Sequence, residues 1–248
     1  MDTQSPIWTF LPGLHGTPEL FGGVKQALPN TIESEFVELP TKGSQRYTTL
    51  STWLDEHLPR GVERVLIAES FSGPIALRLA ALRPDEVCGV VLVASFCDAP
   101  INPGIALLPL RPLFMVKPPK AALRHFLIGD DAEDAEVADL SNVIQTIPSR
   151  TLANRVRAVL ELQEQDNPTL ADVPMMILQA QSDNLVPWDA QQRLEACYPE
   201  ARVHWIEAPH LAMQRYPEKC VQMIQSFVEN LPVKQILVGA SSKADPTE

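Results

Sequence analysis

Short apolar runs alternate with amphipathic segments along most of the chain. Six runs have the length of single strands, at residues 7–11, 36–39, 65–68, 90–94, 175–179 and 202–206. Several are apolar without interruption, which is typical of strands that helices cover on both faces. The alternation of strand and helix patterns indicates βαβ units, whose strands run parallel. We therefore predict an α/β fold with a mostly parallel sheet of about six strands.

The segments between the runs have the spacing of amphipathic helices. Apolar residues recur at intervals of three and four over 50–58, 75–80 and 190–198, and most clearly over 220–231. This spacing places the apolar residues on one face of each helix. We expect such helices to pack on both faces of the sheet, since its strands are apolar on both sides.

A long interruption separates the fourth run from the fifth. From 96 to 166 there is no strand pattern, and a proline-rich stretch is followed by helical patterns. An insertion of this size between two core strands predicts a helical cap over the sheet. We divide the chain into a first part of the core (1–95), the cap (96–166), a second part of the core (167–238) and a disordered polar tail (239–248).

The segment LIAESFSGPIALRLA runs from an apolar strand through Ser70 directly into a helix. Such a turn raises a serine hydroxyl above the sheet edge, provided that the residues two before and two after it are small. Ala68 and Ser72 occupy these positions. The alternative nucleophile, Ser72, would have Pro74 two residues after it, and proline fits this turn badly. Ser70 is therefore the predicted nucleophile.

A serine hydroxyl is a weak nucleophile until a histidine removes its proton. His57 lies in a predicted helix, His204 lies in a predicted strand, and His125 lies among charged residues of the cap. His210 follows the last strand in IEAPHLAMQ. Because the carboxyl ends of parallel strands meet at one edge of a sheet, His210 is the predicted base.

The histidine needs a carboxylate to orient it and to stabilise its charged form. Asp183, in QSDNLVPWD, follows the fifth strand and reaches the same edge of the sheet. Asp98 follows the fourth strand and is the alternative. We favour Asp183 as the acid.

Acyl transfer also places negative charge on an oxygen, which needs preorganised N–H donors. The residue after the nucleophile, Phe71, offers one backbone N–H. The second is expected from the loop after the first strand, PGLHG, where Gly13 and Gly16 allow a close turn and Leu14 offers its N–H. The alternative interpretation of PGLHG is an ordinary glycine-rich turn.

These four segments together resemble the α/β-hydrolase superfamily, in its compact, capped subgroup of esterase- and thioesterase-like enzymes. PGLHG is similar to the oxyanion loop, with Pro12 where a histidine commonly stands; AESFSG is similar to the nucleophile turn, SDNLVP to the acid loop and APHLAMQ to the histidine loop. Their order along the chain is the order of this superfamily. The resemblance extends over nearly the whole chain except the cap and the tail. It implies a catalytic triad of Ser70, Asp183 and His210.

This sequence departs from the pattern of the superfamily in two ways. The residues two positions before and two positions after Ser70, Ala68 and Ser72, are small, but neither is glycine. The two antiparallel strands that commonly precede the oxyanion loop are missing, which leaves about six strands.

Charge and cysteine content narrow the choice of partners and compartment. The formal net charge of −11 argues against nucleic acid, since binding phosphates needs clustered Lys and Arg. Four cysteines without a CxxC pair suit reduced thiols. We find neither a signal peptide nor an apolar stretch long enough to span a membrane, so we expect a cytoplasmic protein. No metal-ligand cluster or nucleotide motif is found, and we expect no cofactor.

The side chains that contact the substrate are less clear from the sequence. His15 and Glu69 adjoin the predicted site, and Leu107, Phe114 and Met115 are candidates for an apolar acyl pocket beneath the cap. A role in the core of the cap is equally consistent with these apolar residues. Basic cap residues are candidates for binding an acyl-carrier protein, or form an ordinary solvated face: Arg111, Lys117, Lys120 and Arg124.

The sequence thus predicts hydrolysis of a carboxylic ester or thioester through an acyl-enzyme on Ser70. The same scaffold serves C–C bond hydrolysis, amide hydrolysis, acyl transfer and perhydrolysis, and the fold does not choose among them. A small-molecule sensor that retains the three residues without turnover is the alternative from another functional class.

Overall fold

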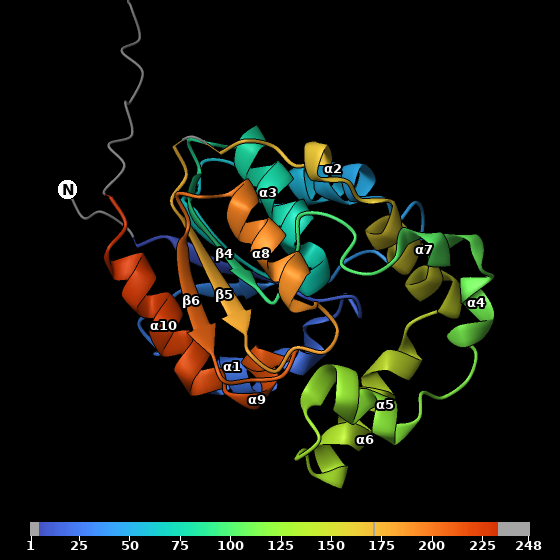
Figure 1. The fold of residues 1–248 in the computed structure, drawn as a ribbon. Helices are drawn as coiled ribbons and strands as arrows, with labels where there is room; N and C mark the ends of the chain where they lie inside the picture. The colour runs from blue at the N-terminus through green and yellow to red at the C-terminus, as the bar shows by residue number, and fades with distance from the viewer. Residues whose placement is uncertain (1–4, 171, 233–248) are drawn as a thin grey trace, which may run out of the picture.

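The structure is a computed structural model that describes residues 5–170 and 172–232, so the tail predicted over 239–248 lies outside the described residues. A six-stranded sheet forms its centre, and every neighbouring pair of strands is parallel. The strands are β1 (Ile7–Leu11), β2 (Ser34–Phe36), β3 (Arg64–Glu69), β4 (Val87–Val93), β5 (Met175–Ala180) and β6 (Arg202–Ile206). Their order is β2-β1-β3-β4-β5-β6. With helices on both faces, this sheet confirms the predicted fold class (Figure 1).

The second strand begins and ends earlier than predicted. After Phe36 the chain leaves the regular ladder with β1, although Val37 still donates its N–H to Phe10 O at 2.9 Å and Leu39 donates to Gly16 O at 2.8 Å. The side chains of Val37 and Leu39 are buried. The apolar run therefore reflects burial beside the sheet edge, and strand pairing covers its first residue alone.

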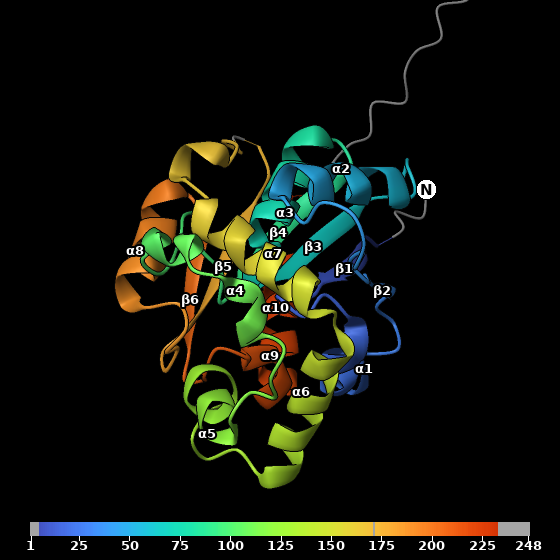
Figure 2. The ribbon, with the colours of Figure 1, turned by 90° about the vertical axis from the view of Figure 1, so that its right-hand side faces the viewer.

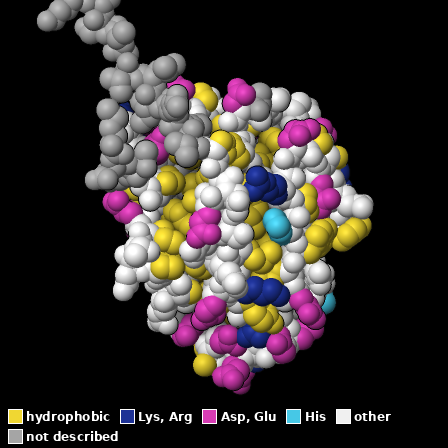
Figure 3. Space-filling model, turned by 90° about the vertical axis from the view of Figure 1, so that its left-hand side faces the viewer, with side chains coloured by type: hydrophobic (Ala, Val, Ile, Leu, Met, Phe, Trp, Pro, Cys, Tyr) yellow, Lys and Arg dark blue, Asp and Glu magenta, His cyan; other side chains and the backbone are white. Residues whose placement is uncertain are grey.

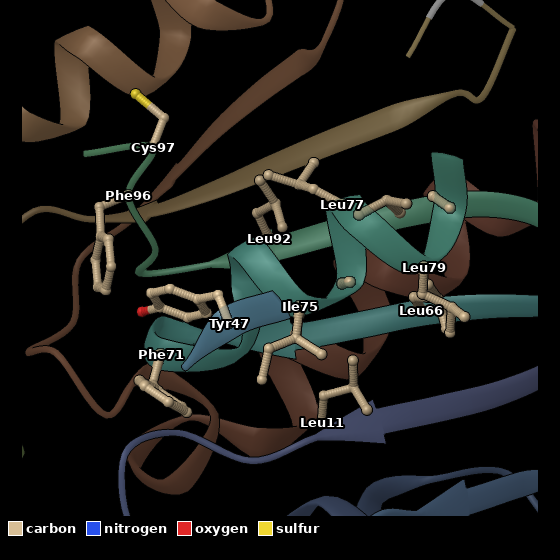
Figure 4. Close-up of a cluster of buried hydrophobic side chains, with 14 of the residues drawn as sticks. Leu11, Tyr47, Leu66, Phe71, Ile75, Leu77, Leu79, Leu92, Phe96 and Cys97 are labelled. Atoms are coloured by element: carbon tan, nitrogen blue, oxygen red, sulfur yellow. The ribbon is translucent and has the colours of Figure 1, made fainter. Parts of the chain in front are cut away.

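Three helices cover one face of the sheet. They are α2 (Tyr47–His57), α3 (Gly73–Leu82) and α8 (Trp188–Cys197). Leu11 and Leu66 of the strands pack in one buried cluster with Leu50 of α2 and Ile75 of α3. Figure 4 shows this cluster between α3 and the strands beneath it. The apolar faces predicted for these helices are thus turned toward the sheet.

Three other helices cover the opposite face. They are α1 (Gly22–Ala27), α9 (Ala212–Arg215) and α10 (Pro217–Glu229), and α1 follows the short 3-10 helix η1 (Pro18–Phe21). Phe10 and Ile67 of the strands pack here with Ile224 and Phe227 of α10. Since successive side chains of a strand point to opposite faces, Phe10 and Leu11 belong to different clusters.

Residues 96–166 form the cap segment, and among the described residues it contains helices and turns without a strand. Its elements are η3 (Pro103–Leu107), α4 (Leu110–Leu113), α5 (Lys120–Leu123), the π-helical turn η4 (Arg124–Ile128), α6 (Asp134–Thr146), α7 (Ser149–Glu161) and η5 (Glu164–Asp166). Figures 1 and 2 show α4 and α7 on one side of the sheet, with α5 and α6 below them. The proline-rich start thus folds into short helices.

Hydrogen bonds attach the cap segment to loops that follow the core strands, including those after β1, β5 and β6. Leu211, in the loop after β6, donates its N–H to Leu127 O at 2.9 Å. Asn184, after β5, donates to His125 O at 2.9 Å. Arg155 of α7 donates to the carbonyls of the loop after β1. The cap segment therefore lies over the carboxyl end of the sheet.

The strand order reverses at β1, so a switch point of the sheet topology lies at that same end. From β1 the chain proceeds outward to β2 and then returns to the other side of β1 for β3. Loops that leave β1 and β3 therefore diverge, and ligands of open α/β sheets bind at such a switch point. The predicted oxyanion loop follows β1, and Ser70 follows β3.

Charged side chains are mixed on the face away from the cap segment. Figure 3 shows acidic and basic groups interspersed among apolar ones there, with acidic groups gathered near its lower end. Over residues 5–170 and 172–232, no helix has both the length and the apolarity needed to cross a membrane.

Candidate active site

Ser70 lies in a strained turn between β3 and α3. β3 ends at Glu69, the 3-10 helix η2 covers Ser70–Ser72, and α3 begins at Gly73. Ser70 has a φ of 47°, a left-handed conformation that is unusual for a residue other than glycine. Strain of this kind persists where the surrounding structure enforces it, and it is common at functional sites.

Contacts around the turn explain why small residues are needed there. Ser95 Oγ donates a hydrogen bond to Ser70 O at 2.8 Å. A Cβ atom at Gly73 would lie 1.9 Å from Ser95 Oγ, so only glycine leaves room for this bond. Ser72 is buried and its hydroxyl donates to Pro12 O. Because that hydroxyl is already engaged, Ser70 remains the better candidate for the nucleophile.

His210 joins Ser70 to Asp183. Its Nε2 lies 2.9 Å from Ser70 Oγ, and its Nδ1 lies 2.8 Å from Asp183 Oδ2. All three residues are buried, and Ser70 is 6% exposed. The arrangement leaves Nε2 able to accept the hydroxyl proton when Nδ1 carries its own proton toward the carboxylate.

Asp183 is oriented by its own loop. Its Oδ1 accepts hydrogen bonds from the N–H groups of Leu185 and Val186, each at 2.8 Å, which leaves Oδ2 for His210. The alternative acid, Asp98, is engaged elsewhere, because its Oδ2 pairs with Arg193 Nε at 2.7 Å. The structure thus brings Asp183 to the histidine and directs Asp98 toward α8.

Two opposing effects act on the pKa of His210. Burial lowers it, but the negative charge and hydrogen bond of Asp183, with a contribution from the charge of Glu69, raise the pKa above the ordinary value of histidine. A more basic imidazole is better able to take a proton from a hydroxyl.

The loop after β1 forms a tight turn beside Ser70. Gly16 N–H donates to Gly13 O at 3.0 Å, and this bond closes a turn with Leu14 and His15 at its centre. Gly16 has a φ of 75°, which favours glycine. Leu14 packs against the same buried cluster as Phe71. The two residues predicted to supply oxyanion donors thus belong to the same side of the sheet core.

Glu69 and His15 are buried around this loop. A Cβ at Gly13 would lie 3.2 Å from Glu69 Oε2 and 3.6 Å from the His15 ring. Gln214 Nε2 donates to Glu69 Oε2 at 3.4 Å. Burial raises the pKa of Glu69 to about 7, and burial lowers the pKa of His15 to about 4. Both residues contact the protein interior, and their contact with a substrate stays a prediction.

The apolar cap residues lie elsewhere than predicted. Leu107 is 90% exposed and Met115 is 67% exposed, so neither lines an enclosed pocket beneath the cap segment. Phe114 packs at the edge of a small cluster with Leu110 and Ala153. Ile105 of η3 and Leu110 of α4 pack against α7, while Leu107 and Leu113 of the same short helices are exposed. This corrects the expectation of a covered acyl pocket built from Leu107 and Met115.

Sequence reasoning missed two residues that hold the site in place. Ser95 follows β4 and supports the Ser70 carbonyl. Arg155 lies on the buried face of α7. A charged residue within an apolar helical face was the available signal for Arg155, whereas no local pattern marks Ser95. Among the described residues, no group of three or more His, Cys, Asp and Glu side chains is arranged to hold a metal ion.

The chain resembles known proteins in both sequence and structure. The family model of serine aminopeptidase, S33, matches residues 48–233, which include Ser70, Asp183 and His210. The biotin biosynthesis bifunctional protein BioHC of Cellvibrio japonicus (strain Ueda107) is 25% identical over 245 residues. That match covers 91% of this chain and 48% of the relative, so the chain spans about half of the relative's length.

Solved structures share the same architecture. An esterase from Exiguobacterium antarcticum superposes with a TM-score of 0.76 at 16% identity, covering 91% of this chain and 92% of the esterase. The enol-lactonase from Burkholderia xenovorans LB400 superposes with a TM-score of 0.72 at 14% identity, covering 91% of this chain and 92% of the lactonase. At these identities the likeness establishes the fold.

Proposed function

We propose that this chain, which belongs to the serine aminopeptidase S33 family of α/β-hydrolases, hydrolyses a carboxylic ester or thioester through an acyl-enzyme on Ser70. The observation that carries the proposal is the unbroken chain of hydrogen bonds from Ser70 Oγ through His210 to Asp183. Nucleophile, base and orienting acid are the three groups that serine hydrolysis requires.

The first half of the reaction acylates the serine. Ser70 Oγ attacks the carbonyl carbon while His210 Nε2 takes the hydroxyl proton, and Asp183 stabilises the resulting imidazolium. The tetrahedral intermediate then collapses: its bond to the leaving group breaks, and His210 returns the proton to the departing alcohol or thiol. In the second half a water molecule repeats these steps on the acyl-enzyme, releasing the acid and restoring Ser70.

Backbone N–H groups of Leu14 and Phe71 are the proposed donors to the oxyanion. Phe71 lies at the start of η2, where the first N–H groups have no acceptor within the helix. Leu14 occupies the turn closed by Gly13 and Gly16. Preorganised donors of this kind strengthen their bonds as charge develops on the carbonyl oxygen.

A small-molecule substrate suits this site better than a carrier protein. Ser70 is almost fully enclosed, which favours a small ester or a single acyl chain that reaches beneath the cap segment. Of the basic cap residues, Lys120 and Arg124 both pair with Asp134, at 3.3 and 2.7 Å. The charges of Lys120 and Arg124 are therefore partly neutralised, and binding of an acyl-carrier protein stays a prediction. The cytoplasmic location also stays a prediction.

The test compares wild type, Ser70→Ala and Ser72→Ala on p-nitrophenyl esters of increasing acyl length. Acyl-thioesters, on both a small thiol and a carrier protein, and aminoacyl anilides complete the set. We expect turnover of esters, a fall in kcat of about 10⁶-fold in Ser70→Ala, and retained turnover in the folded Ser72→Ala control.

Three outcomes would contradict the proposal. Wild-type turnover in Ser70→Ala would exclude this nucleophile. Faster hydrolysis of anilides than of esters would make the chain an amide hydrolase. Tight binding of esters without turnover would indicate a sensor.

A further inference from the structure

Arg155 is a buried cation on the inner face of the cap segment. It lies on α7, on the same helical face as Thr151, Leu152 and Ala158, and its side chain is fully buried. No carboxylate pairs with it among the residues that the structure describes. Burying a charge of this kind costs free energy unless hydrogen bonds compensate it, so the hydrogen-bond partners of Arg155 indicate its role.

Those partners are oxygens of two core loops. Nη1 donates to Leu14 O at 2.9 Å and to His15 O at 2.8 Å, both in the loop after β1. Nε donates to Gln45 Oε1 at 2.9 Å, and Nη2 donates to Pro40 O at 3.2 Å. The planar guanidinium holds its donors in a rigid fork, so these contacts fix orientation as well as distance.

Arg155 and the turn together fix three successive peptide groups. The carbonyl of Gly13 is held by Gly16 N–H at 3.0 Å, and the carbonyls of Leu14 and His15 are held by Arg155. The first of these peptide groups carries the N–H of Leu14, which is the proposed oxyanion donor. Since the peptide groups are planar, fixing the carbonyls also fixes the direction of that N–H.

The loop is built around this guanidinium. A Cβ atom at Gly16 would lie 2.1 Å from Arg155 Nη1, so a larger residue would displace either the arginine or the loop. On its other side, Arg155 Cζ lies 5.8 Å from the centre of the Phe71 ring, and Tyr47 packs on that ring at 5.1 Å between centroids. Arg155 thus contacts both residues proposed to bind the oxyanion.

We propose that Arg155 is a positioning residue that sets the oxyanion-binding geometry from the cap segment, so that the site is complete only when α7 is docked on the core. The inference rests on the proposed function of Leu14 and Phe71. Burial lowers the pKa of Arg155 to about 10, so the group stays charged at neutral pH and keeps its donors.

The experiment substitutes Arg155 by Lys and by Met, with Arg157→Met as the matched control on the exposed face of the same helix. Circular dichroism and thermal melting first establish that each variant is folded. For Arg155→Met on a p-nitrophenyl ester we expect kcat to fall about 100-fold, the order of loss that follows a displacement of about 1 Å at a reacting centre. KM should change within about threefold, because the role is exerted in the transition state. The kcat of Arg155→Lys should lie between those of wild type and Arg155→Met, and the kcat of Arg157→Met should equal that of wild type.

Two further readouts separate positioning from a general structural role. An alkyl boronic acid forms a tetrahedral adduct on the serine, and its inhibition constant should rise in proportion to the loss in kcat/KM. Hydrogen exchange of residues 13–17 should become about tenfold faster in both Arg155 variants, with exchange in β3 and β4 unchanged. This exchange reports on the loop even if the wild type hydrolyses no ester, so failure of the proposed function and failure of this inference remain distinct.

The inference is overturned if folded Arg155→Met keeps kcat and boronic acid inhibition within threefold of wild type. Unchanged exchange in the loop would overturn it as well. Should Arg155→Met not fold, Arg155→Lys decides the matter by the same two measurements.

Discussion

The carboxyl edge of the sheet, which holds the proposed triad, and the outer surface of the cap segment are built in different ways. At the edge, Ser70, Asp183 and His210 are buried, and each bonds to another or to its own loop. In the cap segment, residues such as Leu107 and Met115 are mostly exposed. Most of the large apolar side chains that are exposed in the described residues belong to this segment. Geometry is thus strongly constrained in one region and weakly constrained in the other.

The inner face of the cap segment belongs with the first region. Arg155 and Thr151 of α7 reach core loops, since Thr151 Oγ1 donates to Thr41 O at 2.7 Å. Leu127 and His125 accept hydrogen bonds from the loops that carry His210 and Asp183. The comparison indicates that the inner face of the cap segment holds the site through polar contacts with the loops after β1, β2, β5 and β6, while apolar side chains such as Leu107 and Met115 on its outer surface are exposed.

Gly73→Ala should have the largest effect on stability, because the new Cβ would lie 1.9 Å from Ser95 Oγ in the constrained region. Overpacking of this kind lowers the free energy of unfolding by up to about 3 kcal/mol. Loss of the bond from Ser95 to Ser70 O should lower kcat as well. Gly22→Ala is the control, since nothing lies within 4 Å of a Cβ there and the backbone is helical. Urea unfolding measures both; equal stability of the two variants would contradict the tight packing at the turn.

Glu69→Gln should have an intermediate effect that depends on pH. Burial raises the pKa of Glu69 to about 7, so between its ordinary value and about 7 the folded protein binds a proton that the unfolded chain has lost. Its contribution to stability is therefore full below its ordinary pKa and is lost as pH rises through about 7. Gln cannot ionise, so the free energy of unfolding of the variant should exceed that of wild type at pH 8.5 by at most about 3 kcal/mol. Near pH 4 the two values should be equal.

Melting curves across this pH range, with exposed Glu38→Gln as control, measure the effect. Removing the charge of Glu69 should also lower the pKa of His210, since that charge helps to raise it. The acid limb of kcat/KM should then move to lower pH. A stability difference that is constant with pH would contradict the buried carboxyl.

Leu107→Ala should have the smallest effect, because a side chain that is 90% exposed loses little packing. We expect a change within about 0.5 kcal/mol in the free energy of unfolding and an unchanged KM. Leu110 of α4 is buried against α7, so Leu110→Ala should lower the free energy of unfolding by at least about 2 kcal/mol. A rise in KM for long acyl chains in Leu107→Ala would show that the outer surface of the cap segment binds substrate after all.

Local patterns along the chain were sufficient for the sheet, its helices and the segments that carry Ser70, Asp183 and His210. Strand and helix periodicity depends on which faces are buried, and a continuous hydrophobic run signals burial wherever it occurs. The same property explains the error at β2, where Val37 and Leu39 are buried beside the ladder without belonging to it. Chain order then brought the three residues to one edge, because parallel strands end together.

How the loops are held depends on contacts between distant parts of the chain, which the local patterns do not contain. Ser95 supports Ser70, and Arg155 supports Leu14 and His15 across 140 or more positions of sequence, where no periodicity connects the partners. The sequence also did not indicate that Leu107 and Met115 are exposed, since the pattern of a short apolar helix is the same whichever of its faces is buried. Periodicity and chain order were enough to identify the residues that are available at the edge of the sheet. Packing of α7 on the core decided which backbone groups they meet, because hydrogen-bond geometry depends on three-dimensional position and on nothing local to the chain.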